Sequence, residues 1–252
     1  MNISIKHNNH VYVANLKMPI DISVPIQHNG IRAWGLEKMG VEPVQKDGWI
    51  GDVSCGGGVN FNNIFFNPHA HSTHTECVGH ISAKKESINK ELRSFFFISK
   101  LITVKPKKKQ EDCVITKKML STLISENENI EALIIRTEPN IETKISKNHT
   151  NTNPPYLLKD AAKYISEISI NHLLVDLPSI DKENDEGALD AHKSFWQFPS
   201  NIRYGSTITE LIYVPNNITD GKYLLNLQFA PFENDASPSR PIIFKLEKTE
   251  KE

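Results

Sequence analysis

Four of the ten histidines of this chain lie within twelve residues, and an acidic residue falls among them. The histidines are His69, His71, His74 and His80, and the acid is Glu76. Even scattering would place about 0.5 histidine in such a window, so composition alone does not explain the cluster. Imidazole nitrogen together with carboxylate oxygen is the ligand set that suits zinc, manganese or ferrous iron. The segment therefore predicts a metal site.

Strand geometry indicates which members of the cluster share that site. In an extended strand, residues i and i+2 face the same side. We therefore expect His74 and Glu76 to point to one site, joined by His80 further along and by either His69 or His71 after a bend. Cys77 follows Glu76 directly, so we expect it to point to the opposite face and to pack there.

The three cysteines, Cys55, Cys77 and Cys113, are odd in number and widely spaced. This argues against a disulfide framework and for a reducing compartment, which predicts a cytoplasmic protein. The first nine residues have no apolar core of the kind found in a secretory signal. Nothing in the sequence pairs Cys55 with a base, so it is not expected to be a nucleophile.

Composition excludes several classes of protein. With 29 basic and 30 acidic side chains the formal net charge is -1, which removes any chain-wide electrostatic attraction to nucleic acid or to an acidic membrane. No stretch approaches the roughly 20 apolar residues that a membrane span needs. The chain is 38% hydrophobic and 23% charged, as in globular proteins, and we expect a single domain over residues 1–252.

Hydrophobic patterns then indicate the elements that position the cluster. Apolar, β-branched runs predict strands at the following residues: 95–104, 132–137, 172–177, 207–214, 223–229 and 242–246. Helices are predicted after Thr116, which can cap one, and over residues 156–168 and 187–198. Strands alternating with helices predict a mixed α/β fold.

Two segments are expected to be irregular. Residues 40–63 are rich in Gly, Asn and Asp and predict loops, and residues 105–109 form a basic run that predicts a solvated turn. For the aromatic residues Trp34, Phe61 and Phe65 we expect a place in the core, with a pocket wall near Gly56 as the alternative.

The histidine run resembles the signature of the metal-dependent cyclase family that includes bacterial kynurenine formamidase and isatin hydrolase. That signature is His-x-x-x-His-x-Asp-x-x-x-His, and His74, Glu76 and His80 keep the spacing of its last three members. The acid here is Glu rather than Asp, which lengthens the arm by one methylene. Ala70 stands where the family has its first histidine. A one-residue bulge would let His69 serve in its place, and His71 is the alternative.

Five further segments resemble the family in the same order along the chain. They are a central strand at 134–137, a strand ending in Ser-x-Asp at 174–181, Ala191-His192, a strand ending in Glu210, and the Ser-Pro-x-Arg-Pro run at 237–241. The interval between His192 and Glu210 is longer than is usual in the family, which indicates a loop insertion near the site.

This resemblance implies a swivelling β/β/α fold with a hydrolytic site for one or two divalent ions, with zinc as the expected metal and manganese as the alternative. The implied ligands are His69 (or His71), His74, Glu76, His192 and Glu210. Glu76 would bridge two ions, and His80 would act as general base or proton shuttle. Asp181 would orient a ligand histidine, or begin a turn.

The function that follows is hydrolysis of an amide or ester bond in a small carbonyl compound, such as an aryl formamide or a cyclic amide. A divalent ion lowers the pKa of bound water to roughly 7, and a nearby histidine can move the proton. The alternatives are lyase or dehydratase chemistry on the same fold and a non-catalytic metal-binding module. The expected partners are a small-molecule substrate and, by resemblance, further copies of the chain in a homo-oligomer.

Overall fold

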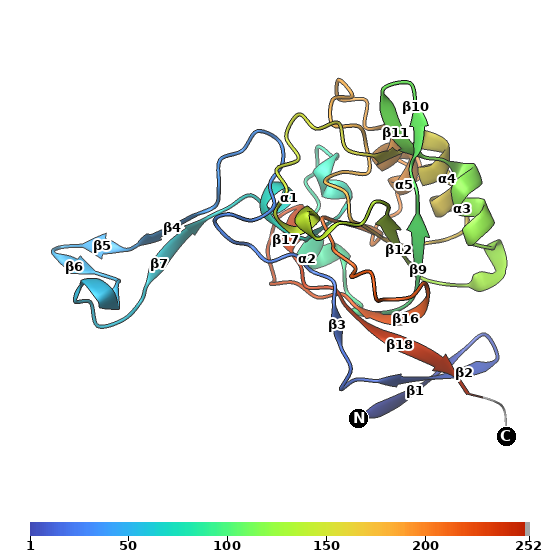
Figure 1. Ribbon diagram of the computed structural model, residues 1–252, viewed down its shortest axis with the longest axis horizontal. Coiled ribbons are helices and arrows are strands. Elements are labelled where there is room, and N and C mark those ends of the chain that lie inside the picture. The colour runs from blue at the N-terminus through green and yellow to red at the C-terminus, as the bar shows by residue number, and fades with distance from the viewer. Residues whose placement is uncertain (250–252) are drawn as a thin grey trace.

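The computed structural model describes residues 1–249, with the backbone alone at Glu126. Its main feature is an 11-stranded mixed sheet (Figure 1). In spatial order the strands are β1 (Asn2–His7), β2 (His10–Asn15), β18 (Ile242–Lys248), β16 (Gly221–Asn226), β9 (Phe96–Val104), β12 (Ala132–Thr137), β14 (His172–Val175), β15 (Thr207–Glu210), β8 (His74–Glu76) and β17 (Ala236–Pro238), with β3 (Ile20–Asp21) paired to β18.

The centre of the sheet is parallel and covered on both faces. Strands β9, β12, β14 and β15 run parallel to one another, and all six residues of β12 are buried. Alternate residues of β12 belong to different cores: Leu133 and Ile135 pack in one cluster, Ala132 and Ile134 in the other. Burial on both faces is typical of parallel sheets and explains the continuous apolar run in the sequence.

Three helices cover one face of this central region (Figure 1). They are α3 (Lys117–Leu123), α4 (Lys159–Glu167) and α5 (Asp190–Trp196). Thr116 caps α3 as expected, because its side chain accepts a hydrogen bond from the backbone N–H of Met119. The mixed α/β fold predicted from the sequence is confirmed.

Shorter elements connect these parts. The helical ones are α1 (Pro68–His71), α2 (Ile88–Glu91), η1 (Val53–Cys55), η2 (Val78–His80), η3 (Glu126–Glu128) and η4 (Glu142–Ser146). A three-stranded sheet is formed by β10 (Lys107–Lys109), β11 (Asp112–Ile115) and β13 (Tyr156–Leu157). Among residues 1–249, no helix combines the length and the apolar character that crossing a membrane requires.

Three expectations for local structure are wrong. The basic run at 105–109 is not all loop, because β10 pairs with β11 through its backbone while its lysine side chains remain exposed. The segment predicted as a helix from residue 156 begins with β13, which pairs with β11, and turns helical only at Lys159. Both errors arise because strand pairing, within the β10–β11 hairpin and between β11 and the more distant β13, depends on backbone groups that the side-chain pattern does not report.

The third wrong expectation is the Gly-rich segment. Residues 40–65 form two paired ribbons, β4 (Gly40–Pro43) with β7 (Asn62–Phe65) and β5 (Gln45–Lys46) with β6 (Trp49–Ile50). Together they make an arm that extends away from the rest of the molecule (Figure 1). Phe61 and Phe65 lie exposed on this arm and Trp34 is partly exposed, so none of the three belongs to the core.

One buried histidine gives the fold a pH dependence. His172 on β14 packs on Phe97 with ring centroids 3.9 Å apart, and its Nδ1 shares a hydrogen bond with the Thr207 hydroxyl. Burial, with a smaller effect of the Arg203 charge, lowers the pKa of His172 from 6.5 to about 3. Between these pH values the unfolded chain binds a proton that the folded chain does not, so stability is lost as pH falls through that window.

We therefore expect the free energy of unfolding to decrease below about pH 6.5, by up to about 1.4 kcal/mol per pH unit from this group. His172→Gln should be less stable at neutral pH but should show a flatter dependence between pH 6.5 and 4. Urea unfolding of both proteins in the presence of a chelator measures the difference. Parallel curves for the two proteins would show that His172 is not responsible.

Candidate metal centre

Strand register brings three of the expected residues to one face of the sheet. In β8, His74 and Glu76 are two residues apart and point the same way. β15 lies antiparallel to β8, with Glu210 directly opposite His74. Directly opposed side chains in antiparallel strands are close neighbours. Accordingly, His74 Nε2 lies 3.4 Å from Glu210 Oε2.

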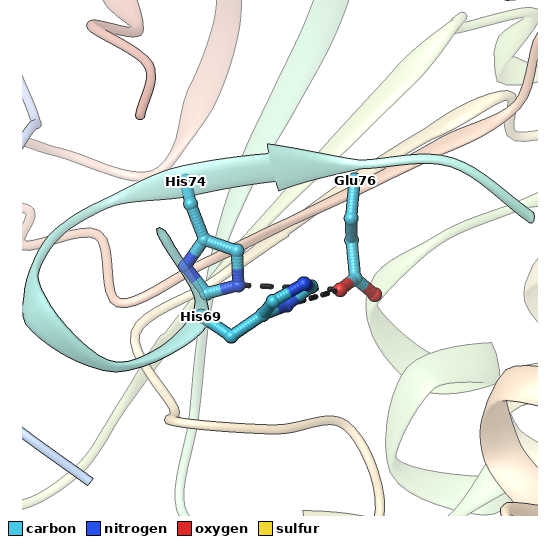
Figure 2. Close-up of side chains that lie close together, drawn as sticks. All are labelled: His69, His74 and Glu76. Atoms are coloured by element: carbon cyan, nitrogen blue, oxygen red, sulfur yellow. Dashed lines mark ion pairs between the residues drawn. The ribbon is translucent and has the colours of Figure 1, made fainter. Parts of the chain in front are cut away.

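A one-turn helix ahead of β8 supplies His69. Asn67 caps α1 and Pro68 occupies its first turn, after which Ser72 is fully extended and leads the chain back into β8. This bend places His69 Nδ1 3.1 Å from Glu76 Oε2 (Figure 2). The indole N–H of Trp34 donates to the His69 carbonyl and fixes the turn from outside.

His71, the alternative to His69, is engaged elsewhere. Its Nδ1 accepts a hydrogen bond from the backbone N–H of Asn67, and its Nε2 lies 2.7 Å from the Glu37 carbonyl, to which it donates. Both ring nitrogens are thus committed to local structure. The geometry therefore favours His69 over His71 as a donor.

The last expected donor comes from α5. His192 Nε2 lies 3.1 Å from Glu76 Oε1, and its Nδ1 donates to Asp181 Oδ2 at 2.6 Å. The Asp181 carboxylate also accepts from the backbone N–H groups of Ala191 and His192, so it caps the helix that it orients. Asp181 therefore positions the His192 ring.

The imidazoles of His69, His74 and His192 share one arrangement. In each ring the inner nitrogen faces Glu76, and the outer nitrogen, on the far side of the ring, donates a hydrogen bond to another group. His74 donates from Nδ1 to the Ser72 carbonyl, His69 from Nε2 to Asp235, and His192 from Nδ1 to Asp181. Such outer hydrogen bonds are typical of metal-ligating histidines, because they fix the tautomer and the ring orientation.

Two atoms at the centre test whether a cation fits. His74 Nε2 and Glu76 Oε2 are buried and have no hydrogen-bond partner within the described chain. Leaving buried polar atoms unsatisfied costs free energy, and a divalent cation would satisfy both. The surrounding donors are imidazole nitrogens and carboxylate oxygens, which suit zinc and manganese. The residues present therefore fit a metal ion.

The two oxygens of Glu76 face different donors. Oε2 lies toward His69 and His74, at 3.1 and 4.0 Å from their inner nitrogens. Oε1 lies toward His192, whose Nε2 is also 3.8 Å from Glu210 Oε1. The carboxylate of Glu76 consequently stands between two groups of donors, as a ligand shared by two ions would.

Electrostatics at the centre favour positive charge. Burial raises the pKa of the Glu76 carboxyl, but the charge of His80, the hydrogen bond from His192 and the close approach of His69 outweigh it and hold the pKa well below its ordinary value. Burial alone would lower the pKa of His69 and His192, whereas the neighbouring carboxylates raise each to about 10. The same carboxylates would attract a divalent cation.

His80 occupies the solvent side of the cluster. Its side chain is 31% exposed, whereas those of His74 and Glu76 are fully buried. Its ring centroid lies 4.3 Å from that of His69 and 5.6 Å from that of His192. A histidine beside the donors and in contact with water is placed to exchange protons with solvent.

Sequence reasoning missed Asp235. It directly precedes β17, and its Oδ2 lies 2.9 Å from His69 Nε2 and 3.2 Å from His80 Nδ1. Burial raises its pKa, but these hydrogen bonds hold the pKa well below the ordinary value. The available signal was its place next to the Ser-Pro-x-Arg-Pro run of 237–241.

Cys77 packs as expected from its place after Glu76. It is buried in an apolar cluster, and its thiol donates to the Glu86 carbonyl at 3.2 Å. Burial raises the pKa of the thiol to about 12. A thiol that stays protonated is neither a good ligand nor a nucleophile.

Comparisons with known proteins identify the family and the fold. A family model described as "Putative cyclase" matches residues 20–182. Kynurenine formamidase from Bacillus cereus is 28% identical over 230 residues, covering 89% of this chain and 96% of its own. A solved structure described as a potential metal-dependent hydrolase with cyclase activity superposes with a TM-score of 0.64 at 17% identity, covering 90% of this chain and 98% of its own. Isatin hydrolase A from Labrenzia aggregata superposes with a TM-score of 0.65 at 13% identity, covering 91% of this chain and 94% of its own. Both structures show the same fold.

Proposed function

The chain belongs to the cyclase family, and from this premise we propose that it is a metal-dependent hydrolase of an amide or ester bond in a small carbonyl substrate. For an amide substrate, the bond cleaved is a C–N bond other than a peptide bond, as in an aryl formamide or a cyclic amide. The observation that carries the proposal is that three imidazoles and two carboxylates meet in one buried cluster. Two atoms of this cluster, His74 Nε2 and Glu76 Oε2, have no hydrogen-bond partner within residues 1–249.

The proposed ligands are His69, His74, Glu76, His192 and Glu210, with Glu76 shared if two ions bind. Zinc is the proposed metal, and manganese accepts the same donors. A divalent ion held there would acidify water and polarise the substrate carbonyl. The carboxylates of Glu76 and Glu210 would fix its position, because Glu210 is itself held by the backbone N–H of Ile180.

His80 is the proposed general base. It would take a proton from the attacking water as the new C–O bond forms, and deliver that proton to the leaving nitrogen as the C–N bond breaks. Its exposure lets it exchange protons with solvent between turnovers.

The names of relatives support the substrate class. One is called kynurenine formamidase and another isatin hydrolase, which point to a formamide and to a cyclic amide on an aromatic ring. Both bonds join a carbonyl carbon to nitrogen. A small aromatic amide is therefore the proposed substrate.

Solvent-oxygen incorporation tests the proposed reaction. The zinc- or manganese-loaded protein is incubated with aryl formamides, cyclic amides and lactones in ¹⁸O-labelled water. The mass of the acid product is then measured by mass spectrometry. Hydrolysis predicts one solvent oxygen in the product. A product without label would indicate lyase chemistry, and metal binding without turnover on any of these compounds would indicate a binding module.

We also propose that the chain forms a homo-oligomer through its arm, residues 40–65. Phe61, Ile64 and Phe65 on this arm are each more than half exposed, as is Val41 on the opposite strand. Exposed apolar side chains gathered on one projecting segment can be buried against another protein chain. A second copy of the chain is the proposed partner, since small-molecule chemistry needs no other.

Sedimentation velocity checks the oligomer. The wild-type protein is expected to sediment as a dimer or larger, and Ile64→Asp should dissociate it. Ile141→Asp is the matched control, because Ile141 is similarly exposed but lies outside the arm. A monomeric wild-type protein, or dissociation by the control variant alone, would contradict the proposed interface.

The cytoplasm is the proposed location. Cys55, Cys77 and Cys113 are all free thiols, which suits a reducing compartment.

A further inference from the structure

We propose that Asp235 is a positioning residue that fixes the general base, holding His80 as the Nδ1–H tautomer with Nε2 free to accept a proton. This inference rests on the proposed function, because it assigns a task to the base of that reaction. It does not depend on which substrate is cleaved.

The contacts of a single oxygen carry the proposal. Asp235 Oδ2 lies 3.2 Å from His80 Nδ1 and accepts a hydrogen bond from that nitrogen. The same oxygen accepts from His69 Nε2 at 2.9 Å. An imidazole that donates from Nδ1 keeps its lone pair on Nε2, and that nitrogen can then accept a proton.

The backbone around Asp235 holds its carboxylate in place. The carbonyl of Asp235 accepts from the backbone N–H of Cys77 at 3.0 Å, and that of Asn234 accepts from Ile88 at 2.8 Å. Directly afterwards β17 pairs with β8, with Ala236 opposite Glu76. The orienting carboxylate therefore lies one residue before the strand that pairs with the strand of the central carboxylate.

Sharing one oxygen couples the base to a donor of the metal centre. His69 turns its Nδ1 toward Glu76 Oε2 while its Nε2 donates to Asp235. His80 stacks on His69 at 4.3 Å with an angle of 31° between the ring planes. Asp235 thus fixes the position of the His80 ring beside the metal donors, just as Asp181 fixes the orientation of the His192 ring.

The matched pair of variants is Asp235→Ala and Glu233→Ala. Glu233 is two residues away on the same loop and carries the same charge, but its partners are Asn89 and Lys90. For Asp235→Ala at saturating metal we expect kcat to fall about 10- to 100-fold, with KM within about twofold of wild type. Asp235→Asn keeps an acceptor oxygen and should lose less. Glu233→Ala should match wild type.

A tautomer measurement separates this role from a merely structural one. Long-range ¹H–¹⁵N spectra of the zinc-loaded, histidine-labelled protein report which nitrogen of each ring carries the proton, with His80→Gln assigning the signal. We expect Nδ1–H at His80 in wild type and in Glu233→Ala, and loss of that form in Asp235→Ala.

Three results would overturn the inference: Nε2–H at His80 in wild type, an unchanged tautomer in Asp235→Ala, or the loss of one bound ion from Asp235→Ala in metal excess. The last result would make Asp235 a ligand. If wild type shows the expected tautomer, and Asp235→Ala loses it, but wild type hydrolyses nothing, then the proposed function fails while the control of the His80 tautomer by Asp235 stands.

Discussion

Glu76→Gln is expected to lose bound metal and turnover together. Glu76 stands between the two groups of donors, with one oxygen 3.1 Å from His69 and the other 3.1 Å from His192. The amide keeps the shape of the side chain but removes the charge that attracts a cation. Because removing residues that only support ligands costs 10–100-fold, we expect metal affinity to fall by more than about 100-fold. Elemental analysis after dialysis, together with the hydrolysis assay, measures both effects.

Glu76→Asp is the control for this substitution. It restores the charge on an arm shorter by one methylene, and the family signature carries Asp at this place. We therefore expect it to retain metal more tightly than Glu76→Gln, and circular dichroism should show both variants folded. Equal metal content in wild type and Glu76→Gln would contradict the proposed ligand.

His80→Gln is expected to separate metal binding from catalysis. His80 is partly exposed and turns its Nδ1 toward Asp235, so it lies beside the donors rather than among them. Loss of a general base typically costs about 10²–10⁴ in rate, and we expect kcat to fall within that range. Metal content should stay at the wild-type value.

His7→Gln serves as the control for His80→Gln. His7 lies at the end of β1 and is remote in the sheet from β8, so both metal content and kcat should be unchanged. Full activity in His80→Gln would exclude His80 as the base. Loss of metal in His80→Gln would instead make it a ligand.

The sequence predicts the buried centre of the fold well. Residues 132–137 were expected to be a strand, and β12 has the same bounds, because a strand covered on both faces must be apolar throughout. The shared face of His74 and Glu76 also follows from local geometry, since period two is a property of any extended strand. Both predictions need only neighbours in the sequence.

The features that the sequence does not predict depend on contacts between separate segments of the chain. Asp235 reaches His80 only because β17 pairs with β8, a contact between segments about 160 residues apart. The choice between His69 and His71 depends on how Asn67 caps one helical turn, which commits His71 Nδ1 to the backbone. The arm forms ribbons through backbone pairing that its Gly-rich composition conceals. Neither the single domain over 1–252 nor the identity of the metal follows from these contacts, and both stay predictions.

Anomalous diffraction from crystals of the zinc-loaded protein tests directly whether a metal ion binds among these side chains. We expect a zinc peak bounded by His69 Nδ1, His74 Nε2 and Glu76 Oε2, with a second ion, if bound, between Glu76 Oε1, His192 and Glu210. A zinc peak elsewhere in the molecule, or no peak at this position in crystals shown by elemental analysis to contain stoichiometric zinc, would contradict it.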